Sequence, residues 1–209
     1  MDFLDALLLL GLGFFVGLSG AVMPGPLLVY TVNESLRKGK WVGAYVILGH
    51  AMVEVLVFGL LALGLLELIS SPTATKAVSI VGGAALIVMA LLSLRDLKSR
   101  VAVSPGKVKH GSVVGGIVFT AFNPGFPIWW LTAGAALLAA GYKEMSYLGM
   151  VLVFLGHWAA DLGWFLFVSM TTSKGSRYLF EKGWYHKARI LLSAVLFLIG
   201  IYFLSTALS

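Results

Sequence analysis

The amino-acid sequence predicts an all-α integral membrane protein. We expect six transmembrane helices arranged as two inverted three-helix repeats, with broken first and fourth helices. Three observations lead to this prediction. Of the 209 residues, 59% are hydrophobic and only 11% are charged, whereas soluble domains are about 45–50% apolar and about 25% charged. The chain contains six apolar stretches long enough to cross a bilayer, and its two halves share motifs at corresponding places.

Composition also excludes several classes of function. The formal net charge is +6, but the basic residues lie in short loops between apolar runs. This distribution is typical of membrane topology signals rather than of phosphate recognition, so we expect no nucleic-acid partner. The chain has no cysteine, which excludes disulfides, thiolate metal ligands and thiol redox chemistry. We expect no cofactor and no enzymatic activity.

A membrane-spanning helix needs about 20 mostly apolar residues. The N-terminus is acidic and precedes a long apolar stretch, which predicts a retained first span rather than a signal peptide. A loop with Ser104-Pro105-Gly106 and several basic residues predicts a hinge at the midpoint. We therefore expect a first repeat over 1–98, a cytoplasmic linker over 99–111 and a second repeat over 112–209. The predicted spans are residues 6–31, 42–66, 77–94, 112–140, 146–171 and 190–208.

The distribution of lysine and arginine predicts the orientation. Thirteen of the 15 lie in three alternate loops, and the other two, Lys76 and Lys143, lie in the remaining loops. Because short cytoplasmic loops carry an excess of basic residues, we expect a multi-pass protein of the plasma membrane with both termini outside. The basic cytoplasmic residues are Arg37, Lys38, Lys40, Arg95, Lys98, Arg100, Lys107, Lys109, Lys174, Arg177, Lys182, Lys187 and Arg189.

Two motifs occur once in each half of the chain. The first span contains Met23-Pro24-Gly25-Pro26, and the fourth contains Asn123-Pro124-Gly125-Phe126-Pro127. The second span contains Gly49-His50 followed by Glu54, and the fifth contains Gly156-His157 followed by Asp161. Inverted repeats with interrupted helices at corresponding positions are typical of the central site of a transporter. The matched motifs therefore predict a solute-binding site at the interface of the two repeats.

The proline motifs predict breaks in the first and fourth helices. Proline lacks an N–H and clashes with the carbonyl four residues earlier, so a regular helix would strand the carbonyls of Gly20, Val22, Thr120 and Asn123. Because lipid cannot satisfy free backbone groups, we expect such breaks to face protein or a water-filled cavity. The new helix N-terminus attracts a carboxylate and free carbonyls suit a cation, so one break could hold both ends of a zwitterion. The alternative is a plain proline kink.

Glu54 and Asp161 are the acidic residues inside the predicted spans. An ionisable side chain at mid-depth costs about 2.5–3.5 kcal/mol and is by default a functional candidate. His50 and His157 each lie four residues earlier, which places imidazole and carboxylate on one helix face. We expect these four residues to exchange a proton or Na⁺ for the substrate. The alternative is a hydrogen bond that only ties the spans together. Because no lysine or arginine lies within a span, zwitterions or cations are favoured over anions.

These residues resemble the lysine-exporter (LysE/RhtB) translocator family. In the first half the resemblance rests on Met23-Pro24-Gly25-Pro26, on Ser35-Leu36-Arg37-Lys38-Gly39 and on Gly49 and Glu54 of the second span. Asn123-Pro124 and Gly156-His157 with Asp161 fit the same pattern in the second half, so the resemblance covers nearly the whole chain. It implies six spans and efflux of amino acids or related metabolites, driven by a proton or sodium gradient. Many members have a lysine where this chain has Gly125, and a glycine where it has Val53. The central-site residues implied are Pro24, Gly25, Pro26, Asn123, Pro124, Glu54 and Asp161.

Three functions fit the sequence to different degrees. The first is a secondary transporter that exports amino acids or similar zwitterionic or cationic metabolites. The second is a divalent-metal exporter, since two histidines and two carboxylates could form a tetrahedral Zn²⁺ site. The third is an intramembrane metal-dependent hydrolase that uses metal-bound water. The expected partners are a small-molecule substrate and the lipid bilayer, and a homo-oligomer is left open.

Overall fold

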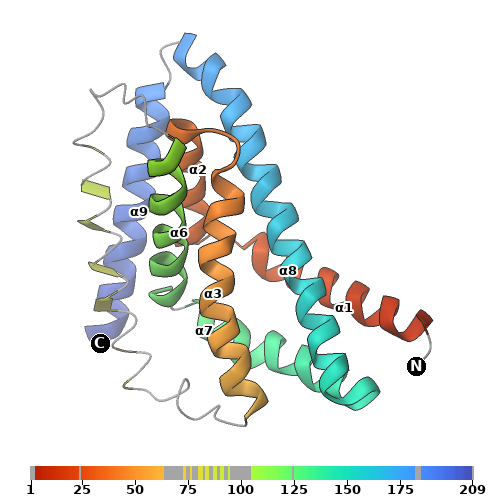
Figure 1. Cartoon of the computed structure of the whole chain (residues 1–209). Coiled ribbons are helices and arrows are strands. Elements are labelled where there is room, and N and C mark those ends of the chain that lie inside the picture. Colours follow the sequence, from red (N-terminus) through yellow and green to blue (C-terminus); the bar gives the residue numbers. More distant parts are fainter. Residues whose placement is uncertain are drawn as a thin grey trace.

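The fold is built from helices. The structure, a computed structural model, describes residues 3–23, 25–63, 105–123, 125–181 and 185–208, together with scattered positions between 73 and 94. All regular secondary structure in these residues is helical (Figure 1). Three helical stretches in this part of the chain are long and apolar enough to cross a membrane: Phe3–Ala21, Val42–Ala62 and Gly125–Gly175. The predicted all-α membrane class is therefore confirmed.

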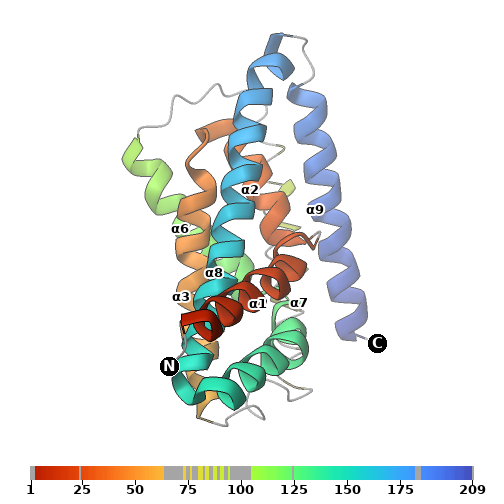
Figure 2. The same ribbon diagram turned by 90° about the vertical axis from the view of Figure 1, so that its right-hand side faces the viewer.

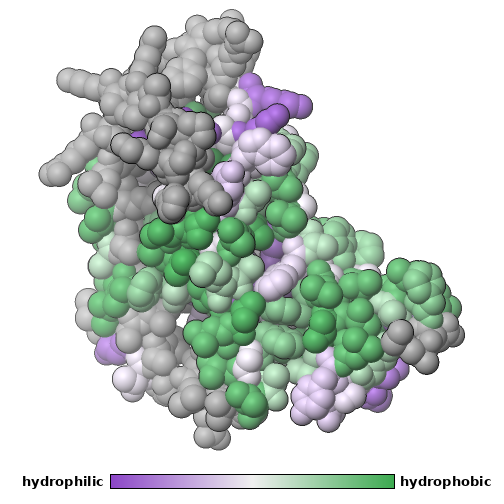
Figure 3. Space-filling view, in the orientation of Figure 1, coloured by the Kyte–Doolittle hydropathy of each residue, from purple (hydrophilic) through white to green (hydrophobic). Residues whose placement is uncertain are grey.

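The surface of the described part is apolar. Figure 3 shows hydrophobic residues over most of one face, with the strongly hydrophilic ones mostly near its upper and lower margins. On the first helix, the side chains of Phe3, Leu8 and Phe15 are 63–76% exposed. A soluble monomer rarely exposes an apolar surface of this extent, whereas a lipid-facing helix must.

The first predicted span is two helices. Helix α1 (Phe3–Ala21) ends before the proline motif, and α2 (Pro26–Lys38) begins within it. Gly25 is the N-cap of α2 in an extended conformation, and Pro26 occupies the first turn, where a missing N–H costs nothing. The chain turns sharply between the two helices (Figure 1). The predicted break is thus confirmed, while Pro24 lies outside the described residues.

The fourth predicted span is also broken. Helix α6 (Pro105–Ala121) stops before the second proline motif, and the chain resumes as α7 (Gly125–Trp129), the π-helical turn η2 (Trp130–Gly134) and α8 (Ala135–Glu181). The Gly125 N–H donates to Asn123 Oδ1 at 3.1 Å. Pro124 lies outside the described residues. The sequence did not predict the π-helical turn, and the segment predicted as a linker, 99–111, is helical from Pro105 onward.

The carbonyls next to these breaks are better satisfied than the sequence predicted. The Met23 N–H donates to the Gly20 carbonyl at 3.1 Å, and the Asn123 N–H donates to the Thr120 carbonyl at 3.1 Å. The Asn123 carbonyl in turn accepts from the Phe126 N–H at 3.0 Å. Stranded carbonyls are expected only for a regular helix, and these three carbonyls instead accept turn hydrogen bonds. The reason is that each helix stops instead of continuing through its prolines, and turn hydrogen bonds replace the missing ones.

The remaining predicted spans differ in how far the structure describes them. Helix α3 (Val42–Ala62) corresponds to the second span and α9 (Tyr185–Leu208) to the sixth. Half of the predicted third span, 77–94, lies outside the described residues. Spans four and five meet at a kink within α8, where Met145 and Ser146 have non-helical backbone angles. This position agrees with the predicted start of the fifth span at residue 146.

Replacing Ser146 by Gly is expected to stabilise the protein. Ser146 has φ 51° and ψ −142°, a conformation that costs a residue with a side chain about 1–3 kcal/mol. Glycine removes this cost. Its greater entropy in the unfolded chain destabilises the folded state by about 0.5–1 kcal/mol, which offsets only part of the gain. The thermal midpoint of the purified protein in detergent should therefore rise. Ser146→Ala, which keeps the Cβ, should show no rise, and a rise in both variants would contradict this explanation.

Helix α3 packs closely against α6 (Figures 1 and 2). Glycines on both helices make this approach possible. A Cβ added at Gly49 of α3 would overlap the carbonyl oxygen of Val113, and a Cβ added at Gly116 of α6 would overlap the carbonyl oxygen of Val46. The backbones of the two helices are thus in direct contact, as in other glycine-mediated membrane helix pairs.

Helix α8 packs against α1 in the same manner (Figure 2). A Cβ at Gly156 of α8 would overlap the carbonyl oxygen of Leu10, and one at Gly13 of α1 would overlap the carbonyl oxygen of Val153. Gly156 holds the position in its motif that Gly49 holds in the first half. Each half therefore contributes one helix to each of the two glycine contacts. An inverted repeat would produce such a pair of contacts, each between a helix of the first half and a helix of the second. The repeat itself stays a prediction.

The ends of the helices that carry basic residues lie together. The Tyr30 hydroxyl donates to the Gly111 carbonyl at 3.0 Å, which joins α2 to the first half of α6. The Ser169 hydroxyl donates to the Lys40 carbonyl at 2.8 Å, which joins the α2–α3 turn to α8. Both chain ends lie toward the opposite end of the molecule, on opposite sides of it (Figures 1 and 2). The assignment of the basic end to the cytoplasm stays a prediction.

Candidate functional site

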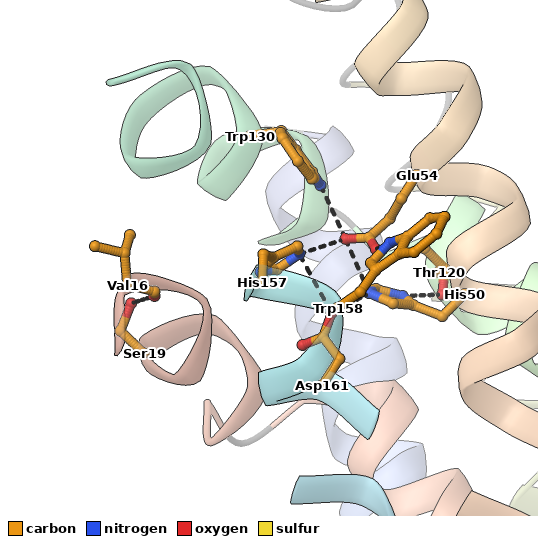
Figure 4. Close-up of polar contacts among 9 residues, drawn as sticks. All are labelled: Val16, Ser19, His50, Glu54, Thr120, Trp130, His157, Trp158 and Asp161. Carbon is orange, nitrogen blue, oxygen red and sulfur yellow. Dashed lines mark hydrogen bonds and ion pairs between the residues drawn. The ribbon is translucent and has the colours of Figure 1, made fainter. Parts of the chain in front are cut away.

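Four ionisable side chains from the two halves converge between α3 and α8 (Figure 4). His50 and Glu54 lie on one face of α3, and His157 and Asp161 lie on one face of α8. All four are buried, and the exposed fraction of the two carboxylate residues is 1% and 2%. We call these residues the four-residue cluster. The spacing of four between histidine and acid produces it, because residues four apart are neighbours on one helix face.

Within the four-residue cluster each imidazole lies between two carboxylates. His157 Nε2 is 2.8 Å from Glu54 Oε1 and 3.2 Å from Asp161 Oδ2. His50 Nε2 is 3.1 Å from Glu54 Oε1 and 3.5 Å from Asp161 Oδ2. The close contacts therefore join α3 to α8 as well as the two residues within each helix. The prediction that the two motifs meet at one place agrees with this geometry.

Two tryptophans hold the Glu54 carboxylate in place. Trp130 Nε1–H donates to Glu54 Oε1 at 3.2 Å, and Trp158 Nε1–H donates to Glu54 Oε2 at 2.8 Å. Trp130 is 1% exposed and comes from the π-helical turn η2. Trp158 directly follows His157 on α8. Glu54 thus keeps both oxygens hydrogen-bonded in a region from which water is largely excluded, which offsets part of the cost of burying its charge.

The two histidines have different surroundings. His50 Nδ1 lies 2.8 Å from the Thr120 hydroxyl of α6. His157 Nδ1 is buried and has no hydrogen-bond partner within the described part of the chain. The backbone of Gly17 on α1 occupies the equivalent place against His157. The Trp129 ring also stacks on the His157 ring at 4.8 Å. The four-residue cluster is therefore chemically asymmetric despite its repeated motif.

The two helix breaks border the four-residue cluster. A Cβ added at Gly25 would lie 3.8 Å from Asn123 Nδ2, so the first and second breaks face each other. The Phe126 ring, just after the second break, makes an edge contact with the His50 ring at 5.6 Å. Among the described contacts, Phe126, which follows the second break, touches the cluster. Gly25, Pro26 and Asn123 make no such described contact with it. The structure thus places the predicted site residues in two adjacent groups.

The four-residue cluster is suited to bind a cation. It combines two carboxylates and two imidazoles, and among the described side chains only these histidines make ion pairs with the acids. One ligand atom from each of the four residues lies within 4.8 Å of the others. A positive charge at this point would be attracted strongly, because charges interact over longer distances in a low-dielectric interior.

Sequence reasoning missed three side chains that support the site. The sequence does not predict that Trp130 and Trp158 donate to Glu54, and it draws attention only to the backbone carbonyl of Thr120. An indole in a membrane span usually indicates helix packing or the membrane interface. Whether it also donates a hydrogen bond to a buried carboxylate depends on the direction of its N–H, which the sequence does not show. The position of Trp158 next to His157 was the available signal. No sequence pattern indicated Thr120 as a partner of His50.

Comparison with protein families assigns the chain to a known family. The model of the LysE type translocator family matches residues 18–207, which is nearly the whole chain. Comparison with curated proteins and with solved structures found no match. Members of this family are transporters of amino acids or similar solutes and not enzymes, which overturns the alternative of an intramembrane hydrolase. The chain belongs to the LysE type translocator family and is a multi-pass membrane transporter.

Proposed function

We propose that this transporter exports amino acids or similar zwitterionic or cationic metabolites across the plasma membrane, and that a proton or sodium gradient drives it. The observation that carries the proposal is the buried four-residue cluster beside two broken helices. Binding sites of secondary transporters are typically formed by discontinuous helices near the bilayer midplane. Membership of the family supports transport, and the cluster supports the choice of a cationic or zwitterionic solute.

The first break provides a place for the carboxylate of a zwitterion. Helix α2 begins at Pro26, directly after the extended Gly25. The N–H groups of the first turn of a helix have no intrahelical partner and attract anions. Asn123 Nδ2 lies near the same point and is a further donor. We propose that the substrate carboxylate binds here, and that Pro24 and Pro124 shape this place although they lie outside the described residues.

The four-residue cluster provides the place for the driving cation. Glu54 and Asp161 together carry two negative charges when ionised, and no arginine or lysine of the described part pairs with them. A proton or Na⁺ bound at Glu54 or Asp161 would compete with the ammonium group of the substrate. His50 and His157 would take part by hydrogen-bonding to whichever carboxylate is not occupied. Such competition couples the movement of the ion to that of the solute.

The function is tested by counterflow in proteoliposomes. The purified protein is reconstituted with one unlabelled amino acid inside, and uptake of the labelled form is measured for a panel of zwitterionic, cationic and anionic amino acids. We expect transient accumulation for zwitterionic or cationic members, and acceleration when a pH or Na⁺ gradient is imposed. Counterflow of anionic amino acids alone, or no counterflow with any member of the panel, would contradict the proposal.

A further inference from the structure

We infer that the four-residue cluster binds a divalent transition-metal ion, with one ligand each from His50, Glu54, His157 and Asp161. Imidazole nitrogen and carboxylate oxygen are common ligands of Zn²⁺, which favours four-coordinate tetrahedral sites. This inference does not depend on amino-acid export, because a membrane site can hold a metal whether or not it moves another solute. It rests on the geometry, the charge and the surrounding hydrogen bonds of the cluster.

Four of the six distances between the donor atoms are close to those of tetrahedral coordination. With metal–ligand bonds of about 2.0–2.1 Å, neighbouring ligand atoms of a regular tetrahedron are about 3.3–3.4 Å apart. The four imidazole–carboxylate distances in the cluster are 2.8, 3.1, 3.2 and 3.5 Å. All four donors lie within 4.8 Å of one another. Shifts of a few tenths of an ångström would therefore bring these four distances to the tetrahedral value.

The charges of the cluster favour a doubly positive ion. The two carboxylates are almost completely buried, and burying ionised groups is expensive unless they are paired. Asp161 Oδ2 is buried and accepts no hydrogen bond within the described part, although the Nε2 atoms of both histidines lie close to it. Glu54 Oε1, in contrast, already receives the Trp130 N–H. With both imidazoles neutral, as metal ligands must be, a divalent cation would balance the two negative charges and would bind Asp161 Oδ2 directly.

The residues around the cluster orient the donors toward one point. The Thr120 hydroxyl contacts His50 Nδ1, so His50 Nε2 faces the centre. The indoles of Trp130 and Trp158 fix the Glu54 carboxylate (Figure 4). Hydrogen bonds of this kind, to the ring nitrogen opposite the metal and to the carboxylate, are typical of metal sites and set ligand direction.

Metal titration of the purified protein in detergent tests the inference. After removal of metals with a chelator, Zn²⁺ is followed by calorimetry and by the fluorescence of the nearby tryptophans, and Co²⁺ by its visible spectrum. We expect one ion per chain, and a Co²⁺ spectrum of tetrahedral type. The variants His50→Ala, His157→Ala, Glu54→Gln and Asp161→Asn should each lose this binding. The controls are His110→Ala and His186→Ala, which remove the only other histidines of the chain and should bind as the wild type does.

A milder variant keeps the test valid if a ligand variant does not fold. Thr120→Val keeps all four ligands and removes only the hydroxyl that contacts His50 Nδ1. Loss of such an outer hydrogen bond typically costs about 10- to 100-fold in metal affinity, and we expect a loss of that size. The inference is overturned if the wild type binds no metal, if Co²⁺ binds with an octahedral spectrum, or if binding is unchanged in every ligand variant. Amino-acid counterflow is measured separately, so a failure of metal binding and a failure of transport can be distinguished.

Discussion

Replacing Glu54 by Gln is expected to abolish solute flux while the protein still reaches the membrane. Glutamine keeps the size of the side chain, and its oxygen can still accept a hydrogen bond from Trp130 or Trp158. It removes the negative charge that lies 2.8 Å from His157 Nε2 and 3.1 Å from His50 Nε2. Without this charge the variant lacks one of the two carboxylates that are proposed to hold the driving cation.

The measurement is uptake into proteoliposomes with an imposed pH or Na⁺ gradient, at equal amounts of reconstituted protein. Asp161→Asn is the counterpart in the other half and should have the same effect, since Asp161 faces the same two imidazoles. Glu144→Gln removes an acidic residue that is exposed and remote in sequence from both motifs, and it should leave flux unchanged. Normal transport by both cluster variants would show that these carboxylates do not carry the driving ion.

The helix breaks could be predicted from the sequence because their cause is local. A proline removes its own N–H and excludes the carbonyl of the preceding turn, so two Pro-Gly motifs within apolar stretches suffice to place the ends of α1 and α6. Where the released carbonyls would go could not be predicted in this way. The carbonyls of Gly20 and Thr120 accept turn hydrogen bonds, because the chain changes direction before the prolines would leave them stranded.

The members of the four-residue cluster could also be predicted, but its asymmetry could not. The spacing in Gly-His-x-x-x-acid places histidine and acid on one helix face, and its recurrence suggested that the two faces meet. The contact of His50 with Thr120, and of His157 with the backbone at Gly17, depends on how α6 and α1 lie against α3 and α8. No local pattern determines such a relation between helices. The same holds for the indole of Trp130, whose direction is set within the π-helical turn η2.

The glycine of each Gly-His motif is expected to be essential for packing. A methyl group added at Gly49 would overlap the Val113 carbonyl oxygen on α6, whereas one added at Gly59, on the same helix, meets nothing within 4 Å. Overpacking of a tight contact typically costs about 1–3 kcal/mol, while Gly→Ala in an open helical position gains up to about 1 kcal/mol. Gly49→Ala should therefore lower the thermal midpoint in detergent, and Gly59→Ala should keep or raise it.

The second half offers the same comparison on α8. A methyl group at Gly156 would overlap the Leu10 carbonyl oxygen on α1, while Gly163 has open space around it. If the two halves are inverted repeats, then Gly156→Ala should destabilise to a similar extent as Gly49→Ala, and Gly163→Ala should resemble Gly59→Ala. Because each tight glycine precedes a cluster histidine, separation of the helices should also move His50 away from Thr120 on α6, or His157 away from Gly17 on α1. Equal stability of all four variants would mean that these backbone contacts do not hold the two halves together.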